Sequence, residues 1–104
     1  MPRIITITFN PCIDKSTTVD ALFPEKKLRC SAPKFEPGGG GINVARAIKK
    51  LGGQATALYP FGGYSGQFLN VLLAEEGIPT QVVETASHTR ENLIVLEDRL
   101  TRIG

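Results

Sequence analysis

The chain shows two periods of apolar positions, and they predict different elements. From Ile4 to Phe9, β-branched residues alternate along the chain in the manner of a strand. Over residues 42–51 and 65–76, apolar residues recur every three or four positions, which predicts two helices with one buried face each. Ser65 is the expected N-cap of the second helix. Glycines follow both segments, as is common just past a helix end.

Short extended segments surround these helices. The segments expected to form strands are 16–22, 27–30, 34–36, 55–59, 81–84 and 93–96. Prolines border the first three, which confines them to edges or small exposed sheets, and we interpret residues 16–36 as a β flap. Pro60 is expected to end the strand before it. Strands that alternate with helices predict an α/β fold with a mostly parallel sheet. Since two helices are too few for both sheet faces, we expect one face or edge to stay exposed.

Length and composition fit one small globular domain. The chain has 104 residues, of which 41% are hydrophobic and 21% charged. No apolar run approaches the roughly 18 residues that span a bilayer, and threonines break the N-terminal apolar stretch, unlike in a secretory signal. The net charge of +2 is too small to indicate nucleic acid as a partner. We therefore expect a cytoplasmic protein with no membrane or nucleic-acid partner.

Few residues could bind a metal or form a disulfide. Cys12 and Cys30 lack the spacing of a metal-binding pair, and we interpret both as free thiols. His88 has no second ligand at a metal-binding distance along the chain, so a surface or loop histidine is the expected role. The sequence predicts no metal site.

The most distinctive segment places four glycines, Gly38 to Gly41, directly before the first helix. Such glycines leave backbone N–H groups at a helix N-terminus, where an anion or polar oxygen is favoured, and they let a ligand approach the backbone. Asn43, on the first turn, offers a donor and an acceptor to a hydroxyl. No Lys-Ser or Lys-Thr follows the glycines, and they lie roughly 30 residues after the first strand, which excludes the nucleotide P-loop and the dinucleotide fingerprint. A flexible hinge is the alternative.

Three charged residues are further candidates for binding. Asp14 follows the first strand, where ligands bind in open α/β sheets, and a carboxylate accepts strong hydrogen bonds from hydroxyls. A turn or helix cap is the alternative. Arg90 offers a planar fork that matches a phosphate, or forms a surface ion pair with Glu84 or Glu91. Lys27 lies in the flap, where a solvated basic face is the alternative.

Four motifs in this order resemble the ribokinase-like carbohydrate kinases, also called the phosphofructokinase B family. They are NPCID, EPGGGGINVARAIKKLGG, FGGYSG and TREN, and they cover most of residues 3–97. Within the family, the chain looks most like the minor-isozyme 6-phosphofructokinases. The resemblance implies that residues 1–97 are the N-terminal part of a ribokinase-like kinase domain. Residues 98–104 do not resemble the family's continuation.

The resemblance also implies a role for each matching residue. Asp14 and Asn43 would bind sugar hydroxyls, and Arg90 would hold the phosphate already on the substrate. Lys27 would lie near the sugar phosphate and reach across a homodimer formed by the flap. The residues whose missing side chains would let the backbone close on the sugar are Gly39, Gly40 and Gly41.

The family's reaction is the ATP-dependent phosphorylation of a sugar phosphate, here expected to be fructose 6-phosphate, with tagatose 6-phosphate or fructose 1-phosphate as alternatives. The resemblance implies ATP and Mg²⁺ for the full-length family. No GAGD motif, which supplies the family's catalytic base, occurs in these 104 residues. We therefore assign no catalytic residue and expect a truncated, inactive chain that does not itself bind ATP. The other interpretations are a non-catalytic sugar-phosphate-binding module and a fragment that associates with a full-length kinase subunit.

Overall fold

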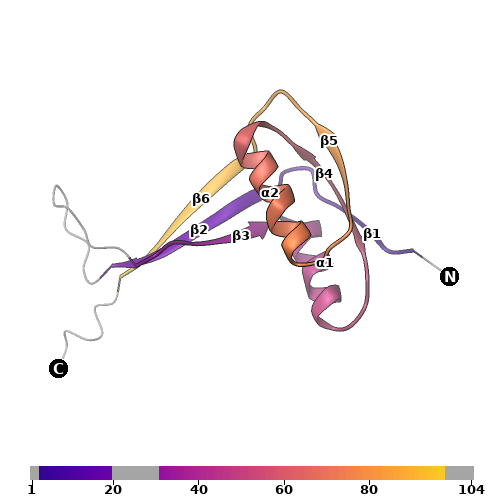
Figure 1. Ribbon diagram of the computed structural model, residues 1–104, viewed down its shortest axis with the longest axis horizontal. Coiled ribbons are helices and arrows are strands. Elements are labelled where there is room, and N and C mark those ends of the chain that lie inside the picture. The colour runs from indigo at the N-terminus through magenta and orange to yellow at the C-terminus, as the bar shows by residue number, and fades with distance from the viewer. Residues whose placement is uncertain (1–2, 20–30, 98–104) are drawn as a thin grey trace.

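The computed structural model describes residues 3–19 and 31–97, which form two three-stranded sheets and two helices (Figure 1). The strands are β1 (Ile5–Ile7), β2 (Cys12–Val19), β3 (Lys34–Gly38), β4 (Thr56–Phe61), β5 (Thr80–Glu84) and β6 (Arg90–Glu97), and the helices are α1 (Gly40–Lys50) and α2 (Gly63–Glu75). Three of the four strand pairings are parallel, so the predicted α/β class with mostly parallel strands is confirmed. Within the described residues, neither helix is long and apolar enough to cross a membrane.

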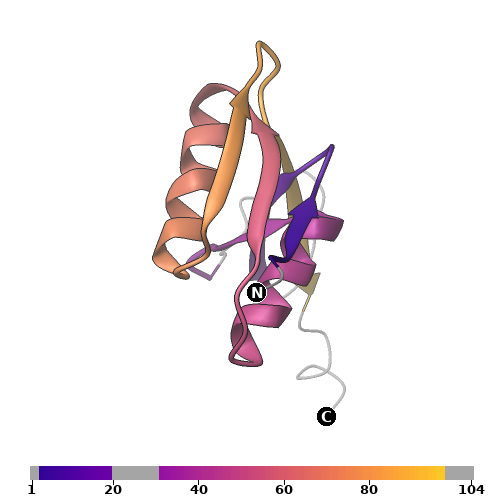
Figure 2. The same ribbon diagram turned by 90° about the vertical axis from the view of Figure 1, so that its right-hand side faces the viewer.

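The first sheet has the order β1-β4-β5 and is parallel throughout. Both helices pack on one face of it, where Ala57 and Tyr59 of β4 belong to the same buried cluster as Ile42 of α1 and Leu69 of α2. The Tyr59 hydroxyl is 2.7 Å from Asn70 Oδ1 and donates a hydrogen bond to it. This helix-covered sheet holds most of the apolar core, and Figure 2 shows its three strands side by side.

The opposite face of this sheet is bare within the described residues, as two helices led us to expect. Ile7 and Phe9 are 57% and 89% exposed, and Val83 of β5 is 58% exposed. An apolar hollow of about 250 Å³ lies among them.

The second sheet has the order β3-β2-β6, and we call it the arm. β2 pairs antiparallel with β3 and parallel with β6, and the arm extends away from the helices (Figure 1). The edge-to-face contact of Phe35 and Phe68, with ring centroids 5.2 Å apart, joins the arm to α2. The sequence pattern did not indicate that β6, far along the chain, completes this sheet. The expected strand 27–30 lies outside the described residues.

Two local expectations were wrong. Pro60 lies inside β4 instead of ending it, because the pairing with β1 stops at Leu58 and the missing N–H therefore faces no partner strand there. Ser65 does not cap α2: Gly62 is the N-cap, and the Ser65 hydroxyl instead donates a 2.7 Å hydrogen bond to the Thr89 carbonyl. That bond fixes the start of β6 against α2.

Candidate functional site

One face of the arm brings together two of the predicted binding residues, Asp14 and Arg90. The strand register sets this arrangement, because residues paired across neighbouring strands point to the same face. Cys12 pairs with Arg90 on one side and Gly38 on the other, and Asp14 pairs with Asn92 and Glu36. The residues of this polar face are Cys12, Asp14, Glu36, Gly38, Arg90 and Asn92.

Asp14 is placed differently from the sequence expectation. It lies inside β2 and not in the segment directly after the first strand, because β2 already begins at Cys12, whereas the second strand was expected from residue 16. The Asn92 amide donates a 3.0 Å hydrogen bond to Asp14 Oδ1, and the Cys12 thiol lies 3.7 Å from the same oxygen. A side chain on Gly38 would bring its Cβ to within 2.9 Å of Asp14 Oδ2, so only glycine leaves room for the carboxylate. The Asp14 side chain is half-buried.

Cys12 is a buried free thiol beside this carboxylate. Burial raises the pKa of Cys12, and the negative charge of Asp14 raises it further, while Arg90 works in the opposite direction. The thiol therefore keeps its proton at neutral pH and can donate it in a hydrogen bond to Asp14.

The glycine run joins the polar face to α1. Gly39, the N-cap of α1, has φ of +121°, and a Cβ there would lie 2.6 Å from the Thr8 methyl. A Cβ on Gly41 would lie 2.6 Å from the Ile7 carbonyl oxygen, whereas one on Gly40 would meet nothing within 4 Å. Gly39 and Gly41 thus allow the helix start to approach β1 closely, which argues against a freely flexible hinge.

Donors at the start of α1 remain available. The Ile42 amide donates a 2.9 Å hydrogen bond to Thr8 Oγ1, and the Asn43 amide bonds to the Gly39 carbonyl. The amides of Gly40 and Gly41 have no acceptor among the described residues. The Asn43 side chain is exposed on the first turn, and no hydrogen bond joins it to Asp14 or Arg90. These groups can meet a ligand oxygen, as expected of a helix N-terminus.

Arg46 links β3 and the glycine run to the end of α2 through hydrogen bonds. Its guanidinium donates to the Pro37 carbonyl at 3.1 Å, to Glu76 at 2.8 Å and to Glu36 at 3.4 Å. Partial burial works to lower the pKa of Arg46, but the two carboxylates outweigh it and raise the pKa. The pKa of Glu36 is lowered, first by its hydrogen bond with Lys34. The sequence reasoning missed Arg46 because Glu76 lies 30 residues away and no local signal links them.

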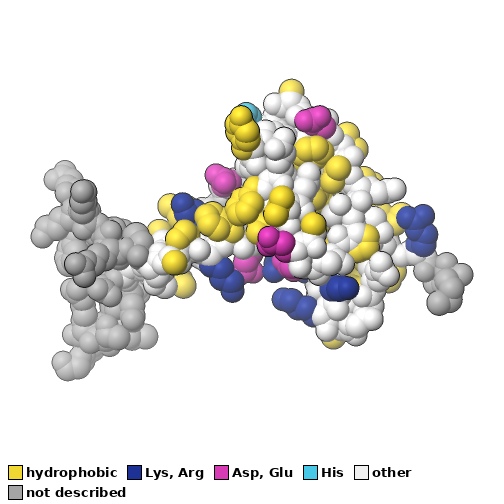
Figure 3. Space-filling model, in the orientation of Figure 1, with side chains coloured by type: hydrophobic (Ala, Val, Ile, Leu, Met, Phe, Trp, Pro, Cys, Tyr) yellow, Lys and Arg dark blue, Asp and Glu magenta, His cyan; other side chains and the backbone are white. Residues whose placement is uncertain are grey.

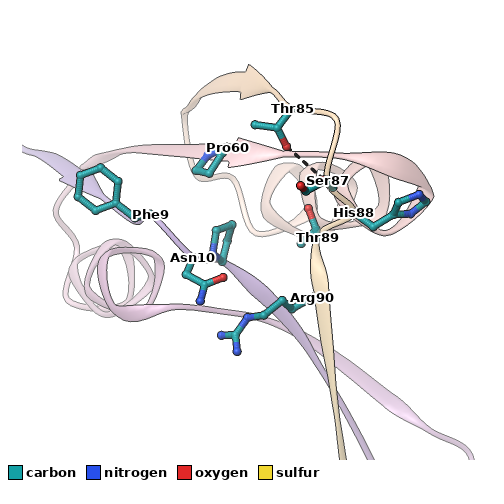
Figure 4. A pocket seen from close by; sticks show the side chains of 9 residues that line it. Phe9, Asn10, Pro60, Thr85, Ser87, His88, Thr89 and Arg90 are labelled. Atoms are coloured by element: carbon teal, nitrogen blue, oxygen red, sulfur yellow. Dashed lines mark hydrogen bonds between the residues drawn. The ribbon is translucent and has the colours of Figure 1, made fainter.

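Arg90 opens β6 at the edge of a pocket of about 240 Å³. Figure 4 shows its side chain extending towards Asn10 on the opposite wall. Neither Glu84 nor Glu91 forms an ion pair with Arg90, so the surface-pair alternative is wrong for the described residues. The pocket is lined by Phe9, Asn10, Pro11, Pro60, Thr85, Ser87, His88, Thr89 and Arg90.

The loop before β6 is held by buried contacts. Thr89 Oγ1 accepts a 3.1 Å hydrogen bond from the Gly62 amide, and the Thr89 amide donates to the Gly62 carbonyl. His88 is exposed, and its ring lies where a side chain on Gly63 would have to go. These contacts fix where β6 starts and hence where Arg90 stands.

Not every predicted residue can be placed. Lys27, expected near the sugar phosphate, lies outside the described residues. Asn92, which the sequence reasoning did not single out, is in contact with Asp14, and its signal was the two-residue spacing from Arg90 that puts both on one strand face. No three of the His, Cys, Asp and Glu side chains in residues 3–19 and 31–97 come together as a metal site.

Comparison with known proteins gives a consistent match. The model of the pfkB family carbohydrate kinases matches residues 5–100. The chain is 56% identical over 95 residues to ATP-dependent 6-phosphofructokinase isozyme 2 of Escherichia coli strain K12, and 50% identical over 101 residues to the protein of that name in Mycobacterium tuberculosis strain H37Rv. It resembles the crystal structure of Escherichia coli phosphofructokinase-2 in complex with fructose-6-phosphate with a TM-score of 0.84 and 56% identity, covering 91% of this chain and 31% of that one.

The matches cover nearly all of this chain but only part of each relative. They include 91% and 97% of its residues for the Escherichia coli and Mycobacterium tuberculosis proteins. The chain spans only 31% and 30% of the length of those two relatives.

Proposed function

Because this chain belongs to the pfkB family of carbohydrate kinases, we propose that the polar face of the arm binds a sugar phosphate. The parent reaction is then the ATP-dependent phosphorylation of fructose 6-phosphate. The observation that carries the proposal is the juxtaposition on one face of the Arg90 guanidinium, which has no ion-pair partner among the described residues, and a carboxylate held in place, Asp14. A phosphate and a hydroxyl-rich sugar are the chemistry that this pair recognises.

Each predicted residue receives a role in this proposal. Arg90 holds the phosphate of the substrate, since its fork has no carboxylate partner among the described residues. Asp14 accepts hydrogen bonds from sugar hydroxyls, and Asn43 binds another hydroxyl from the first turn of α1. The backbone at Gly39, Gly40 and Gly41 closes on the sugar, with the amides of Gly40 and Gly41 as donors. We keep Lys27 as a second group near the phosphate.

We further propose that the 104-residue chain binds the sugar phosphate but does not catalyse phosphoryl transfer. Phosphoryl transfer needs a base near the attacking hydroxyl and stabilisation of the developing charge. The sequence holds no GAGD motif, and the described residues hold no carboxylate cluster suited to a metal. Asp14 already has its Oδ1 engaged by Asn92 in a binding position. ATP and Mg²⁺ are therefore assigned to the full-length relatives.

A second candidate function is association with another kinase subunit, either a copy of this chain or a full-length one. It is favoured by the exposed apolar side chains of the arm, visible as a band in Figure 3. On β6, Leu93 and Leu96 are 65% and 58% exposed. Mixing the chain with a full-length kinase and measuring the oligomer mass tests this candidate: a mixture that shows only the separate masses of the two unmixed species speaks against it.

We place the protein in the cytoplasm as part of the same proposal. Cys12 is a free thiol, and free thiols are the usual state in a reducing compartment.

Calorimetric titration with fructose 6-phosphate tests the main proposal. The unaltered chain should bind weakly, and Arg90→Ala should weaken binding by at least tenfold, because a charge-assisted contact to phosphate is lost. Glu91→Ala is the matched control, since Glu91 is the next residue along β6 and points to the other face. Equal affinity of the unaltered chain and Arg90→Ala would remove Arg90 from the site. Parallel titrations with tagatose 6-phosphate and fructose 1-phosphate rank the three candidate substrates.

A further inference from the structure

Asp14 is held by a residue from a strand far along the chain. Asn92 of β6 lies directly beside it in the parallel register, and its Nδ2 donates a 3.0 Å hydrogen bond to Asp14 Oδ1. The same Nδ2 is 3.5 Å from the Cys12 sulfur, and the Cys12 thiol lies 3.7 Å from Oδ1. One carboxylate oxygen therefore has two donors from the protein.

The other oxygen, Oδ2, has no donor among the described residues. It faces Gly38, where a Cβ would come within 2.9 Å of it. The last torsion of an aspartate side chain is broad, so an isolated carboxylate on a strand surface would rotate freely. The bond from Asn92 fixes that torsion and leaves Oδ2 as the oxygen available to a ligand.

The neighbour on the other side of Asp14 cannot supply such a donor. Glu36 pairs with Asp14 across β3, and two like charges directly opposite repel. Glu36 is turned to Lys34, at 3.2 Å, and to Arg46, at 3.4 Å. β6 is thus the strand that contributes a donor to Asp14 from across the sheet.

We propose that Asn92 is a positioning residue for sugar-phosphate binding: its amide orients the Asp14 carboxylate so that Oδ2 accepts a sugar hydroxyl. This inference rests on the proposed function and deepens it. It follows that the pairing of β6 with β2 contributes to affinity through one hydrogen bond as well as through the placement of Arg90.

A double-mutant cycle in the 104-residue chain tests the proposal, with fructose 6-phosphate as the probe. Asn92→Ala should weaken binding about tenfold, the worth of one hydrogen bond to a charged group. In an Asp14→Ala background the same change should have no further effect, because the group that it orients is gone. Asn92→Asp keeps the shape but removes the donor, and should bind no better than Asn92→Ala. Asn92→Gln keeps an amide and should recover part of the loss.

Two controls separate positioning from a general effect on the arm. Glu91→Ala changes the neighbouring residue on the opposite face and should leave affinity within twofold. The side-chain amide signals of Asn92 in ¹H–¹⁵N NMR spectra report the hydrogen bond without any ligand, and they should move when Asp14 becomes alanine. A structural role in strand pairing would lower affinity equally in both Asp14 backgrounds.

The outcomes are distinguishable. Additive losses in the cycle, or equal binding by Asn92→Asp and the unaltered chain, would overturn the positioning role while the sugar-phosphate proposal stands. If the unaltered chain binds no fructose 6-phosphate although the Asn92 amide signals respond to Asp14→Ala, then the proposed function fails and the positioning role fails with it. Amide signals that do not respond would contradict the contact itself.

Discussion

The helix-covered sheet and the arm divide the molecule into a region that buries side chains and a region that displays them. Leu69 and Leu73 of α2 are fully buried against β4, whereas Leu93 and Leu96 of β6 are more than half exposed. Burial of a leucine side chain contributes about 1.5–3 kcal/mol, so most of the stability resides in the first region. Most of the proposed binding residues that the structure describes lie on the arm or on the glycine run that joins it to α1.

This separation explains why the glycine run has its composition. The run must pass from a strand of the arm to a helix of the core within a few residues, and Gly39 does so with φ of +121°. Gly38 leaves room for Asp14 on the arm, and Gly41 leaves room for β1 in the core. The glycine run that joins the two regions is therefore tightly packed against both of them. Only at Gly40, among these glycines, would an added side chain meet open space.

A leucine-to-alanine substitution in each region should show the largest difference in stability between the two regions. Leu73→Ala removes a fully buried side chain and should lower the free energy of unfolding by about 2–5 kcal/mol. Leu93→Ala, at a position 65% exposed, should change it by less than about 0.5 kcal/mol. Urea unfolding followed by circular dichroism measures both. Similar losses in the two variants would show that the arm is stabilised by burial after all.

Alkaline pH should destabilise the core through Tyr59. Burial raises the pKa of Tyr59 to about 12. Below the ordinary tyrosine pKa of about 10 both states keep the proton, and above it the unfolded chain ionises first. Stability is therefore lost as pH rises from 10 to 12, by up to about 3 kcal/mol, and Tyr59→Phe should remove this loss.

Tyr64, which is 87% exposed at the start of α2, provides the matched control. Tyr64→Phe should leave the alkaline loss in the urea midpoint unchanged between pH 9 and 11.5. The core assignment of Tyr59 is contradicted if the two phenylalanine variants lose stability in parallel with the unaltered chain.

Adding a methyl group at each of two neighbouring glycines tests how tightly the glycine run is packed. Gly41→Ala places a Cβ 2.6 Å from the Ile7 carbonyl oxygen and Thr8 Oγ1, so the helix start must shift, at a cost of about 1–3 kcal/mol. Gly40→Ala meets open space and should be neutral or stabilising by up to about 1 kcal/mol, because alanine favours the helix. Thermal unfolding of the two variants measures the difference in stability. If the glycine run were flexible, both variants would be equally stable.

The sequence predicted the core better than the arm, for a physical reason. The two helices and the strands of the parallel sheet follow from local periodicity and from glycines that end each helix. The pairing of β6 with β2 joins residues nearly 80 positions apart, and no local pattern encodes such a register. Hence Asp14 was expected just after the first strand and not inside a second one, and Asn92 was overlooked. Arg90 was singled out by its chemistry, but its place beside Cys12 depends on that same register.

An NMR titration of the chain with fructose 6-phosphate tests the division most directly. Each backbone amide reports on its own surroundings, so one experiment compares the two regions. The account predicts shifts at Asp14, Arg90, Asn92 and residues 38–43, and none at the bare face around Ile7 and Val83. Shifts confined to that bare face, or no shifts at ligand concentrations in the millimolar range, would contradict it.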